Sequence, residues 1–299
     1  MSTLTTSKAP YPTHELFKYR AINDYTLSFL RTGAVYFASP REFNDPFDTR
    51  FVNRGLGTQH QQFERERRAK GTDWDRLAII MMDTFEREHR AGEVKIRIYC
   101  LSEIVDSTLM WSHYADSHRG ICVVLEAEQI SETWFMDFAR SSFNFAGMAS
   151  TNVSAEGQIK VINRTVSTEV TIAALPVHKV LYSDQIPGLV MYDPLPSGPM
   201  RGMTFEYVKH SAWSYERERR VVVCESFLAE NPAHLSCDAI VGVVFGLKVS
   251  KFDALRVQAA INDRTDVRSV AYSRMVERPD GFGLDRVPVT DLDSFIHSL

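Results

Sequence analysis

Short apolar runs, each bounded by turn residues or by helical stretches, are the feature that most limits how this chain can fold. The runs at 94–101, 120–126 and 240–247 are rich in Val, Ile and Leu, which is typical of buried strands. Helical stretches separate some of these runs, but strands and helices do not alternate regularly. The pattern predicts an α+β fold in which six to eight short strands form a mixed, mainly antiparallel sheet with flanking helices.

The helical stretches are recognised by their spacing and by their caps. Residues 22–31 carry apolar side chains at helical spacing, with Asn23 or Asp24 as a cap, and Gly33 is placed to end the helix. Further helices are expected at 107–116, 205–212 and 250–261, with Ser107 and Ser250 as caps of the first and the last. The charge-rich residues 58–91 are also expected to be helical.

The organisation along the chain predicts one domain. Residues 1–12 are expected to form a mobile N-terminus, followed by a single α+β domain over 13–299. Residues 140–175 are polar and rich in Asn and Ser, so we expect an insertion there. The Pro- and Gly-rich residues 187–202 are expected to form a long loop.

Composition and charge exclude several classes of protein. The chain has 299 residues, with 34 Lys and Arg against 38 Asp and Glu, which excludes a strongly basic coat for nucleic acid. Its apolar runs fall short of the ~20 residues that a membrane span needs, and the N-terminus has no signal-peptide pattern. The four cysteines show no Cys-x-x-Cys spacing and are expected to be buried thiols. We therefore expect a cytoplasmic protein with no membrane partner.

The densest group of chemically active residues lies at 110–120, in MWSHYADSHRG. If this segment begins as a helix, Trp111 and Tyr114 pack onto a sheet, or they form a pocket wall together with His113. Such rings suit stacking on a flat base or a nicotinamide ring. His113 and His118 are badly spaced for a shared metal ion, so no metal is expected.

A second group, WSYERERR at 213–220, leads into an apolar strand. On an extended strand, Glu216 and Glu218 point to the same face, and Arg217 and Arg219 point to the other. Two carboxylates so close raise the pKa of one of them unless a cation lies between them. The segment is therefore either a solvated strand edge with salt bridges or a functional carboxylate pair.

Strands are also predicted at 14–20 and at 34–39, and the first strand and the loop after the second supply further candidates. Arg20 ends the first strand and could clamp a phosphate with its planar guanidinium, and Lys18 lies on the same face. In the loop FNDPFD, residues Asn44, Asp45 and Asp48 either bind a metal or polar ligand or simply build a turn. No Rossmann or Walker A motif is present.

Taken in order, FKYR, FNDPFD, MWSHYADSHRG, WSYERERR and VVFGLKVS resemble a widespread bacterial family catalogued as a domain of unknown function. That family is often noted near mobile-element and phage-defence genes. The resemblance implies a setting in phage defence, with a partner protein from the same locus, but it implies no chemistry.

Arg20 on the first strand, Tyr36, Phe37 and Ser39 near the second, and Glu216 and Glu218 before a later strand are distantly similar to mono-ADP-ribosyltransferases. This resemblance implies an NAD-dependent transferase acting as a defence or toxin effector. NAD would be a substrate, and the acceptor would be a protein or a nucleic acid. Glu218 would act on the ribose and Glu216 on the acceptor, as the catalytic residues. Arg20, Tyr36, Phe37 and Ser39 are implied for binding NAD, and Trp111, His113 and Tyr114, whose rings suit stacking, join them as candidates.

Two other classes of function stay open. One is a non-catalytic sensor module that binds a nucleotide or a partner protein in a defence system. The other is a metal-dependent, nuclease-like enzyme, with Asp45, Asp48 and Glu216 or Glu218 arranged around Mg²⁺. Dependence of any activity on a metal would favour the last of these.

Overall fold

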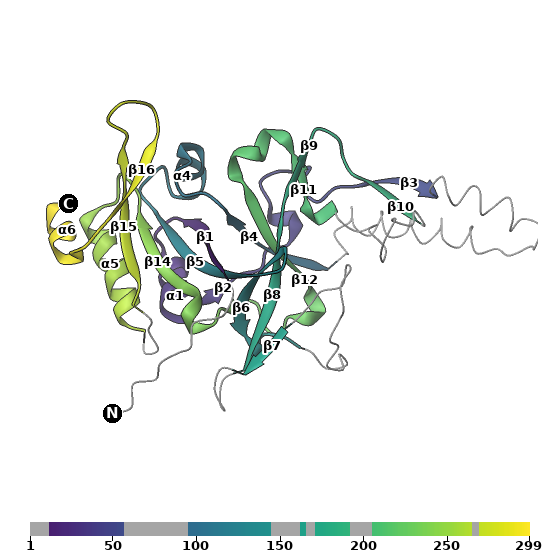
Figure 1. Ribbon diagram of the computed structural model, residues 1–299, viewed down its shortest axis with the longest axis horizontal. Coiled ribbons are helices and arrows are strands. Elements are labelled where there is room, and N and C mark those ends of the chain that lie inside the picture. Colours follow the sequence, from purple (N-terminus) through teal and green to yellow (C-terminus); the bar gives the residue numbers. More distant parts are fainter. Residues whose placement is uncertain (1–11, 57–94, 145–161, 166–170, 192–204, 265–268) are drawn as a thin grey trace, which may run out of the picture.

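The computed structural model describes residues 12–56, 95–144, 162–165, 171–191, 205–264 and 269–299 (Figure 1). Nearly all of the expected mobile N-terminus and the whole charge-rich segment 58–91 lie outside the described residues. So do parts of the expected insertion and of the Pro- and Gly-rich loop. The predictions for those residues stay predictions.

Six antiparallel strands form a closed ring at the centre of the molecule (Figure 1). In order around the ring they are β1 (Thr13–Arg20), β4 (Ile96–Ser102), β12 (Glu218–Cys224), β8 (Thr171–Lys179), β6 (Thr133–Ala139) and β5 (Ile121–Ile130). Strand β5 closes the ring by pairing with β1 along its whole length. A closed sheet leaves few unpaired edges, which gives this small barrel its stability.

The ring is held together unevenly. Strand β1 meets β4 at a single paired position, Phe17 with Ser102, although both strands are fully described. All eight residues of β1 pair with β5, and only one pairs with β4. The seam between β1 and β4 is therefore the most weakly paired position in the barrel. This seam is where a cavity opens.

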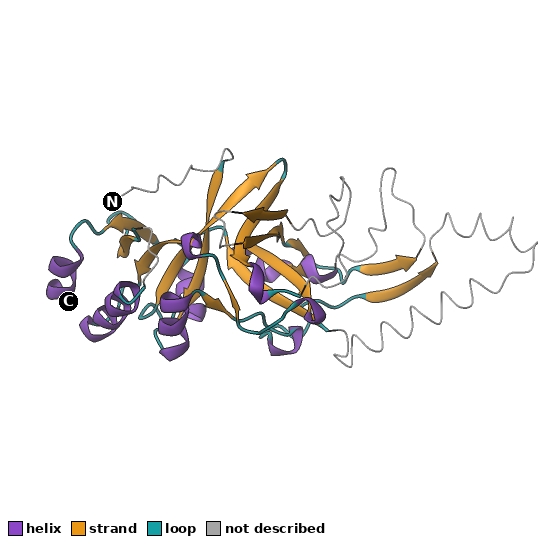
Figure 2. Cartoon of the chain, turned by 90° about the horizontal axis from the view of Figure 1, so that it is seen from below, coloured by secondary structure: helices purple, strands orange, loops and turns teal. Residues whose placement is uncertain are grey.

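A three-stranded extension leaves the ring at β5, which pairs with β6 near its end and with β14 (Ile240–Phe245) near its start. Strand β15 (Ala271–Glu277) runs parallel to β14, and β16 (Leu284–Pro288) pairs antiparallel with β15. Helix α5 (Lys251–Asn262) makes the crossover between the parallel strands. The extension and its helices form one end of the molecule (Figure 2).

The helices begin at the caps that the sequence indicates. Helix α1 (Asp24–Thr32) begins after Asn23, whose side chain accepts a hydrogen bond from the Thr26 amide, and ends at Gly33 with a φ of 72°. The cap of α4 (Thr108–Tyr114) is Ser107, and that of α5 is Ser250. Helix α6 (Leu292–Ser298), which the sequence analysis did not predict, packs on α5.

Three small ladders and several 3₁₀ turns complete the described structure. The ladders are β2 (Ala34–Val35) with β13 (Ala233–His234), β3 (Val52–Leu56) with β10 (Gly188–Met191), and β9 (Leu181–Ser183) with β11 (Val208–His210). Strand β7 (Ile162–Thr165) extends the sheet beside β8. The 3₁₀ turns are Pro40–Glu42, Arg140–Ser142, Phe205–Tyr207, Ser211–Glu216, Glu225–Phe227 and Cys237–Ala239.

All six strands of the ring contribute to one apolar cluster, which also takes in residues of α1 and α5. Its members include Leu16, Tyr99, Val123, Phe138 and Val221, each almost completely buried. A second cluster packs α4 against the opposite face of β1, β5 and β14. Because both faces of β1 and β5 are buried, burial of apolar surface holds α4 against β1, next to the seam.

The observed fold confirms a mixed α+β architecture with a mostly antiparallel sheet, but the main sheet has ten strands in the described residues rather than the six to eight expected. Several local predictions are also wrong. Residues 205–212 do not form an α-helix: they form a 3₁₀ turn, strand β11 and the start of another 3₁₀ turn. Pairing of β11 with β9 outweighs a weak helical propensity there. The expected insertion at 140–175 contains the first part of barrel strand β8, and the expected loop at 187–202 begins with strand β10.

The cysteine prediction is only partly confirmed. Cys100 and Cys122 lie within β4 and β5, with Cys122 buried and Cys100 half-buried, whereas Cys224 is exposed because it ends β12. No helix in the described part of the chain is both long and apolar enough to span a membrane.

Replacing Gly246 with alanine is expected to destabilise the fold. A Cβ there would collide with the carbonyl oxygen of His118 and would lie 2.9 Å from that of Gly120. Both are backbone atoms, so relieving the collision requires the main chain to move. The expected cost is about 1–3 kcal/mol of unfolding free energy, measured as a lower urea midpoint. Gly281→Ala is the matched control, because a Cβ at Gly281 meets nothing within 4 Å. Equal midpoints for the two variants would contradict the prediction.

Candidate functional site

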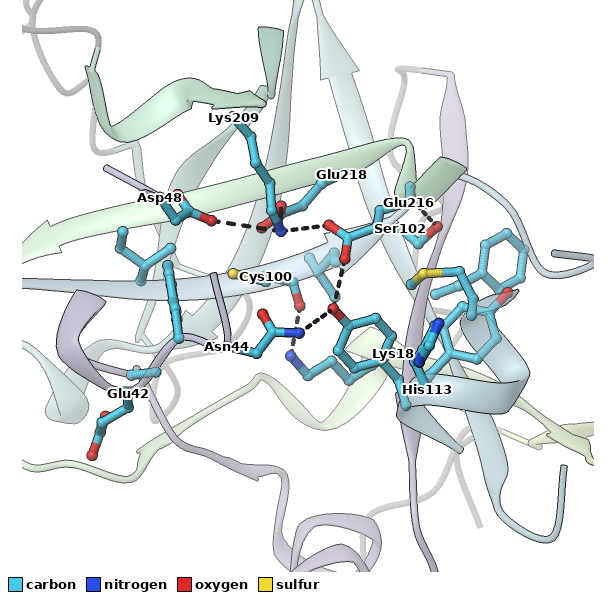
Figure 3. Close-up of a pocket in the computed structure, with 18 of the residues that line it drawn as sticks. Lys18, Glu42, Asn44, Asp48, Cys100, Ser102, His113, Lys209, Glu216 and Glu218 are labelled. Atoms are coloured by element: carbon cyan, nitrogen blue, oxygen red, sulfur yellow. Dashed lines mark hydrogen bonds and ion pairs between the residues drawn. The ribbon is translucent and has the colours of Figure 1, made fainter. Parts of the chain in front are cut away.

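A cavity of about 440 Å³ opens at the seam between β1 and β4 (Figure 3). Its lining comes from β1 and β4, from the loop that follows β2, from α4, and from the stretch that runs from β11 to the first residue of β12. Its polar and charged lining residues are Lys18, Tyr19, Tyr36, Glu42, Asn44, Asp48, Cys100, Ser102, His113, Tyr114, Lys209, Glu216 and Glu218. This size and this mixture are typical of a small-molecule site.

Glu216 and Glu218 both reach the cavity, but not by strand alternation alone. Glu216 ends the 3₁₀ turn Ser211–Glu216, Arg217 adopts a left-handed conformation with a φ of 44°, and β12 begins only at Glu218. The left-handed residue turns the chain so that both carboxylates point inward. Arg217 and Arg219 point away from the two carboxylates, as predicted. Both form ion pairs with Glu103.

A buried ion cluster holds the two carboxylates. The Nζ atom of Lys209 lies 2.6 Å from Glu216 Oε2, 3.2 Å from Glu218 Oε2 and 3.5 Å from Asp48 Oδ2. Arg220, with no exposed side-chain surface, donates from Nε and Nη2 to the two Glu218 oxygens, at 2.8 and 3.0 Å. It also binds both carboxylate oxygens of Asp48. Three carboxylates thus share two cations.

The cluster drives the pKa values of the two glutamates apart. Burial alone would raise the pKa of Glu218, but the ion pairs with Arg220 and Lys209 outweigh burial and lower it to about 2. Burial raises the pKa of Glu216, and the neighbouring Glu218 charge adds to the rise against the opposing effect of Lys209. The pKa of Glu218 is therefore held low, while that of its neighbour Glu216 is raised.

A hydrogen-bond chain connects three distant sequence motifs at Glu216 (Figure 3). The hydroxyl of Tyr114, at the end of α4, donates to Glu216 Oε1 at 2.6 Å. Asn44, from the loop FNDPFD, donates from Nδ2 to the Tyr114 oxygen at 3.1 Å. Burial and the contact with Glu216 raise the pKa of Tyr114, so its proton stays on the phenol. The chain leaves Glu216 with each oxygen oriented.

Strand β1 contributes Lys18 to the opposite wall. The Lys18 Nζ atom donates to the backbone oxygen of Cys100 at 2.7 Å and lies 4.7 Å from the centre of the Tyr99 ring. Burial lowers the pKa of this amine. The cavity therefore has a carboxylate wall and a facing lysine.

The structure brings together five of the nine residues predicted for the site. Tyr36, His113, Tyr114, Glu216 and Glu218 all line the cavity. Tyr36 is half exposed at the rim, where its hydroxyl donates to Glu42. His113 is exposed, with its ring 6.3 Å from the ring of Tyr215.

The other four predicted residues lie outside the cavity lining. Arg20 is turned toward α1, where it donates to the Thr26 hydroxyl and lies over the Phe29 ring. Phe37 is fully buried in the main core, and Ser39 caps the 3₁₀ turn Pro40–Glu42. Trp111 is also fully buried, and its indole donates to the Val105 oxygen at 2.6 Å.

The sequence analysis missed Lys209, which lies at the centre of the ion cluster. It also missed Arg220 as the buried partner of Glu218 and Asp48. Lys209 lies in the segment wrongly predicted as a helix, where a single lysine looks like a solvated side chain. The only signal for it was indirect: the two carboxylates needed a cation between them. Asp48, which the sequence had offered as a metal ligand or a turn residue, belongs to the same cluster.

Comparison with known proteins adds one finding. Residues 110–221 match a family described as "Protein of unknown function (DUF2971)". The matched stretch includes Tyr114, Lys209, Glu216 and Glu218, whereas Lys18 and the loop with Asn44 and Asp48 precede it. No curated protein and no solved structure matches the chain. The likeness thus supports a family of unknown function and brings no activity with it.

Proposed function

We propose that the cavity is the active site of an enzyme that breaks the bond between nicotinamide and ribose in NAD and passes the ADP-ribosyl group to an acceptor. The observation that carries the proposal is the pair Glu216 and Glu218, which meet in one cavity with their pKa values driven apart. Carboxylate pairs of this kind serve glycosyl transfer, in which positive charge develops on a sugar ring. The distant similarity to mono-ADP-ribosyltransferases supplies NAD as the substrate.

Glu218 has the role of the permanent anion. When the bond between nicotinamide nitrogen and ribose C1 breaks, the bonding electrons leave with nicotinamide and the ribose becomes an oxocarbenium-like cation. A carboxylate that is ionised at every ordinary pH and held rigidly by Arg220 stabilises this charge without reorganising.

Glu216 has the role of the proton acceptor. Its raised pKa suits a group that takes a proton from the acceptor nucleophile as that nucleophile bonds to ribose C1. Tyr36, His113 and Tyr114 supply ring faces at the cavity wall for the nicotinamide or the acceptor. Arg20, outside the cavity, has no part in the proposed site.

The test uses NAD carrying a label on its adenylate half, incubated with purified protein in the presence and absence of cellular protein and nucleic acid. The expected result is release of nicotinamide with transfer of label to a macromolecule, which would also identify the acceptor. Release without transfer would indicate hydrolysis at the same site. No nicotinamide release in any mixture would contradict the proposal.

A non-catalytic binding module is the second candidate, favoured by one observation. Both oxygens of Glu218 are engaged by Arg220 and Lys209. If those contacts persist with ligand bound, the cavity can bind a nucleotide without reacting with it. Isothermal titration that shows NAD binding, with no nicotinamide released over hours, would favour this candidate.

The nuclease-like alternative needs Asp45, Asp48 and Glu216 or Glu218 around Mg²⁺. Asp48, Glu216 and Glu218 surround the ammonium of Lys209, so a positive charge already lies where they converge. Asp45 is not among the residues that line the cavity. The described residues contain no group of three or more His, Cys, Asp or Glu side chains arranged to hold a metal ion.

Tyr114→Phe tests the role of Glu216 through its pH dependence. The Tyr114 hydroxyl stabilises the ionised form of Glu216, so removing it raises the pKa of that carboxyl. Because the ionised form accepts the proton, the acidic limb of the rate profile is expected to move to higher pH. Turnover should fall more at pH 6 than at pH 8.5. Asn44→Ala, which removes only the outer bond, should shift the limb less, and an unchanged limb in Tyr114→Phe would refute the role.

A further inference from the structure

The cavity contains two enclosed lysines that differ in their partners. Lys209 has three carboxylates within 3.5 Å of its nitrogen. Lys18 has one hydrogen bond, to the backbone oxygen of Cys100, and no ion pair with any residue in the described part of the chain. The Tyr99 ring lies close to the same nitrogen.

The surroundings of Lys18 act against its charge. Burial is the main cause of its lowered pKa, and the guanidinium of Arg20 acts in the same direction. The Cys100 and Cys122 thiols and the more distant Glu218 act in the opposite direction and do not compensate. An enclosed ammonium without a counter-ion has two outcomes: it binds an anion, or it gives up its proton and becomes a nucleophile.

The position of Lys18 makes the second outcome chemically useful. Its side chain lines the cavity and is only half-buried, so part of its surface stays open to a ligand in that space. The carboxyl of Glu216, whose pKa is raised, lines the same cavity and can exchange protons there (Figure 3). An uncharged amine that shares a cavity with a proton-transfer group is the arrangement that imine-forming enzymes use.

We propose that Lys18 is a nucleophilic amine that forms an imine with the aldehyde or ketone of a small, sugar-sized ligand. The nitrogen lone pair makes the bond to the carbonyl carbon, and the two amine hydrogens end on the carbonyl oxygen, which leaves as water. This step needs no NAD, so it goes beyond the proposed function and can fail or succeed independently of it.

The test is reductive trapping on the intact protein. Wild-type protein is incubated with glyceraldehyde and sodium cyanoborohydride, which reduces an imine to a stable secondary amine, and the labelled lysines are identified by peptide mapping over a range of pH. Lys18 is expected to be labelled about tenfold faster than Lys209, the matched enclosed lysine in the same cavity. Its labelling midpoint should lie at lower pH than that of the exposed Lys251.

Two variants complete the test. Lys18→Arg keeps a long basic side chain but cannot form an imine, so the adduct on this peptide should vanish, with folding checked by thermal melting. Lys251→Arg, at an exposed lysine outside the cavity lining, should leave trapping at Lys18 intact. Labelling of Lys18 no faster than that of Lys209, or with the midpoint of Lys251, would overturn the proposal. Protection of Lys18 by inorganic phosphate together with that ordinary midpoint would assign it instead to anion binding.

Discussion

Glu218→Gln is expected to lower the release of nicotinamide from NAD by about 10²–10³-fold, the usual loss when a group aimed at a developing charge is removed. Glutamine has nearly the same shape but no negative charge, so the oxocarbenium-like ribose loses its stabilising partner. The measurement is turnover at saturating NAD, with binding followed separately by titration calorimetry. Binding should change far less than turnover, because the anion acts mainly in the transition state.

The control for this variant is Glu225→Gln, which removes a carboxylate that lies outside the cavity lining and pairs with Arg97 and Lys95. Its turnover should equal that of the wild type. Near-UV circular dichroism of Glu218→Gln checks that the cluster still folds, since Arg220 keeps its two bonds to Asp48. A folded Glu218→Gln protein with normal turnover would remove Glu218 from the mechanism.

Arg220→Met is expected to destabilise the protein by about 3–5 kcal/mol. The guanidinium has no exposed surface and binds both oxygens of Glu218 and both of Asp48, so its loss leaves two buried carboxylates with Lys209 alone. Urea unfolding measures the effect. In the wild type, the contribution from Glu218 is fully present above about pH 4.5 and is lost as pH falls toward 2, because its folded pKa is lowered to about 2.

Two further variants show whether charge is the cause. Arg217→Met removes an exposed guanidinium that pairs with Glu103, and it should cost less than about 1 kcal/mol. The double variant Arg220→Met/Glu218→Gln should recover part of the stability lost in Arg220→Met, because it removes one of the stranded charges. A loss below 1 kcal/mol in Arg220→Met would show that the cluster does not depend on its arginine.

Most of the regular elements could be predicted because their signals are local. The run at 120–126 became the start of β5, and Ser107, Ser250 and Gly33 begin or end the helices where their chemistry places them. Prediction failed at 205–212, where pairing between β11 and β9 decides the structure. It also missed β6 (Thr133–Ala139), whose mixed polar and aromatic residues form a strand through their ladders to β5 and β8.

The candidate site was half predictable for the same reason. Glu216 and Glu218 are two residues apart, so their proximity was expected, although a left-handed Arg217 rather than an extended strand turns both inward. Tyr114 lies on a helix that the sequence identifies. Arg20 was misplaced because the end of β1 turns its side chain toward Thr26, a contact that depends on how α1 packs. Lys209 could not be assigned, since nothing near it in sequence shows that Asp48 approaches from a distant loop.

The sequence by itself determined the class of fold, the helix caps and the pair of neighbouring carboxylates, because these depend on side chains a few residues apart. Only the tertiary structure decided that the sheet closes into a ring and that β1 barely meets β4. It also decided which cations face each carboxylate. Those features depend on strands far apart in the chain, whose pairing and burial set the pKa values of Glu216, Glu218 and Lys18.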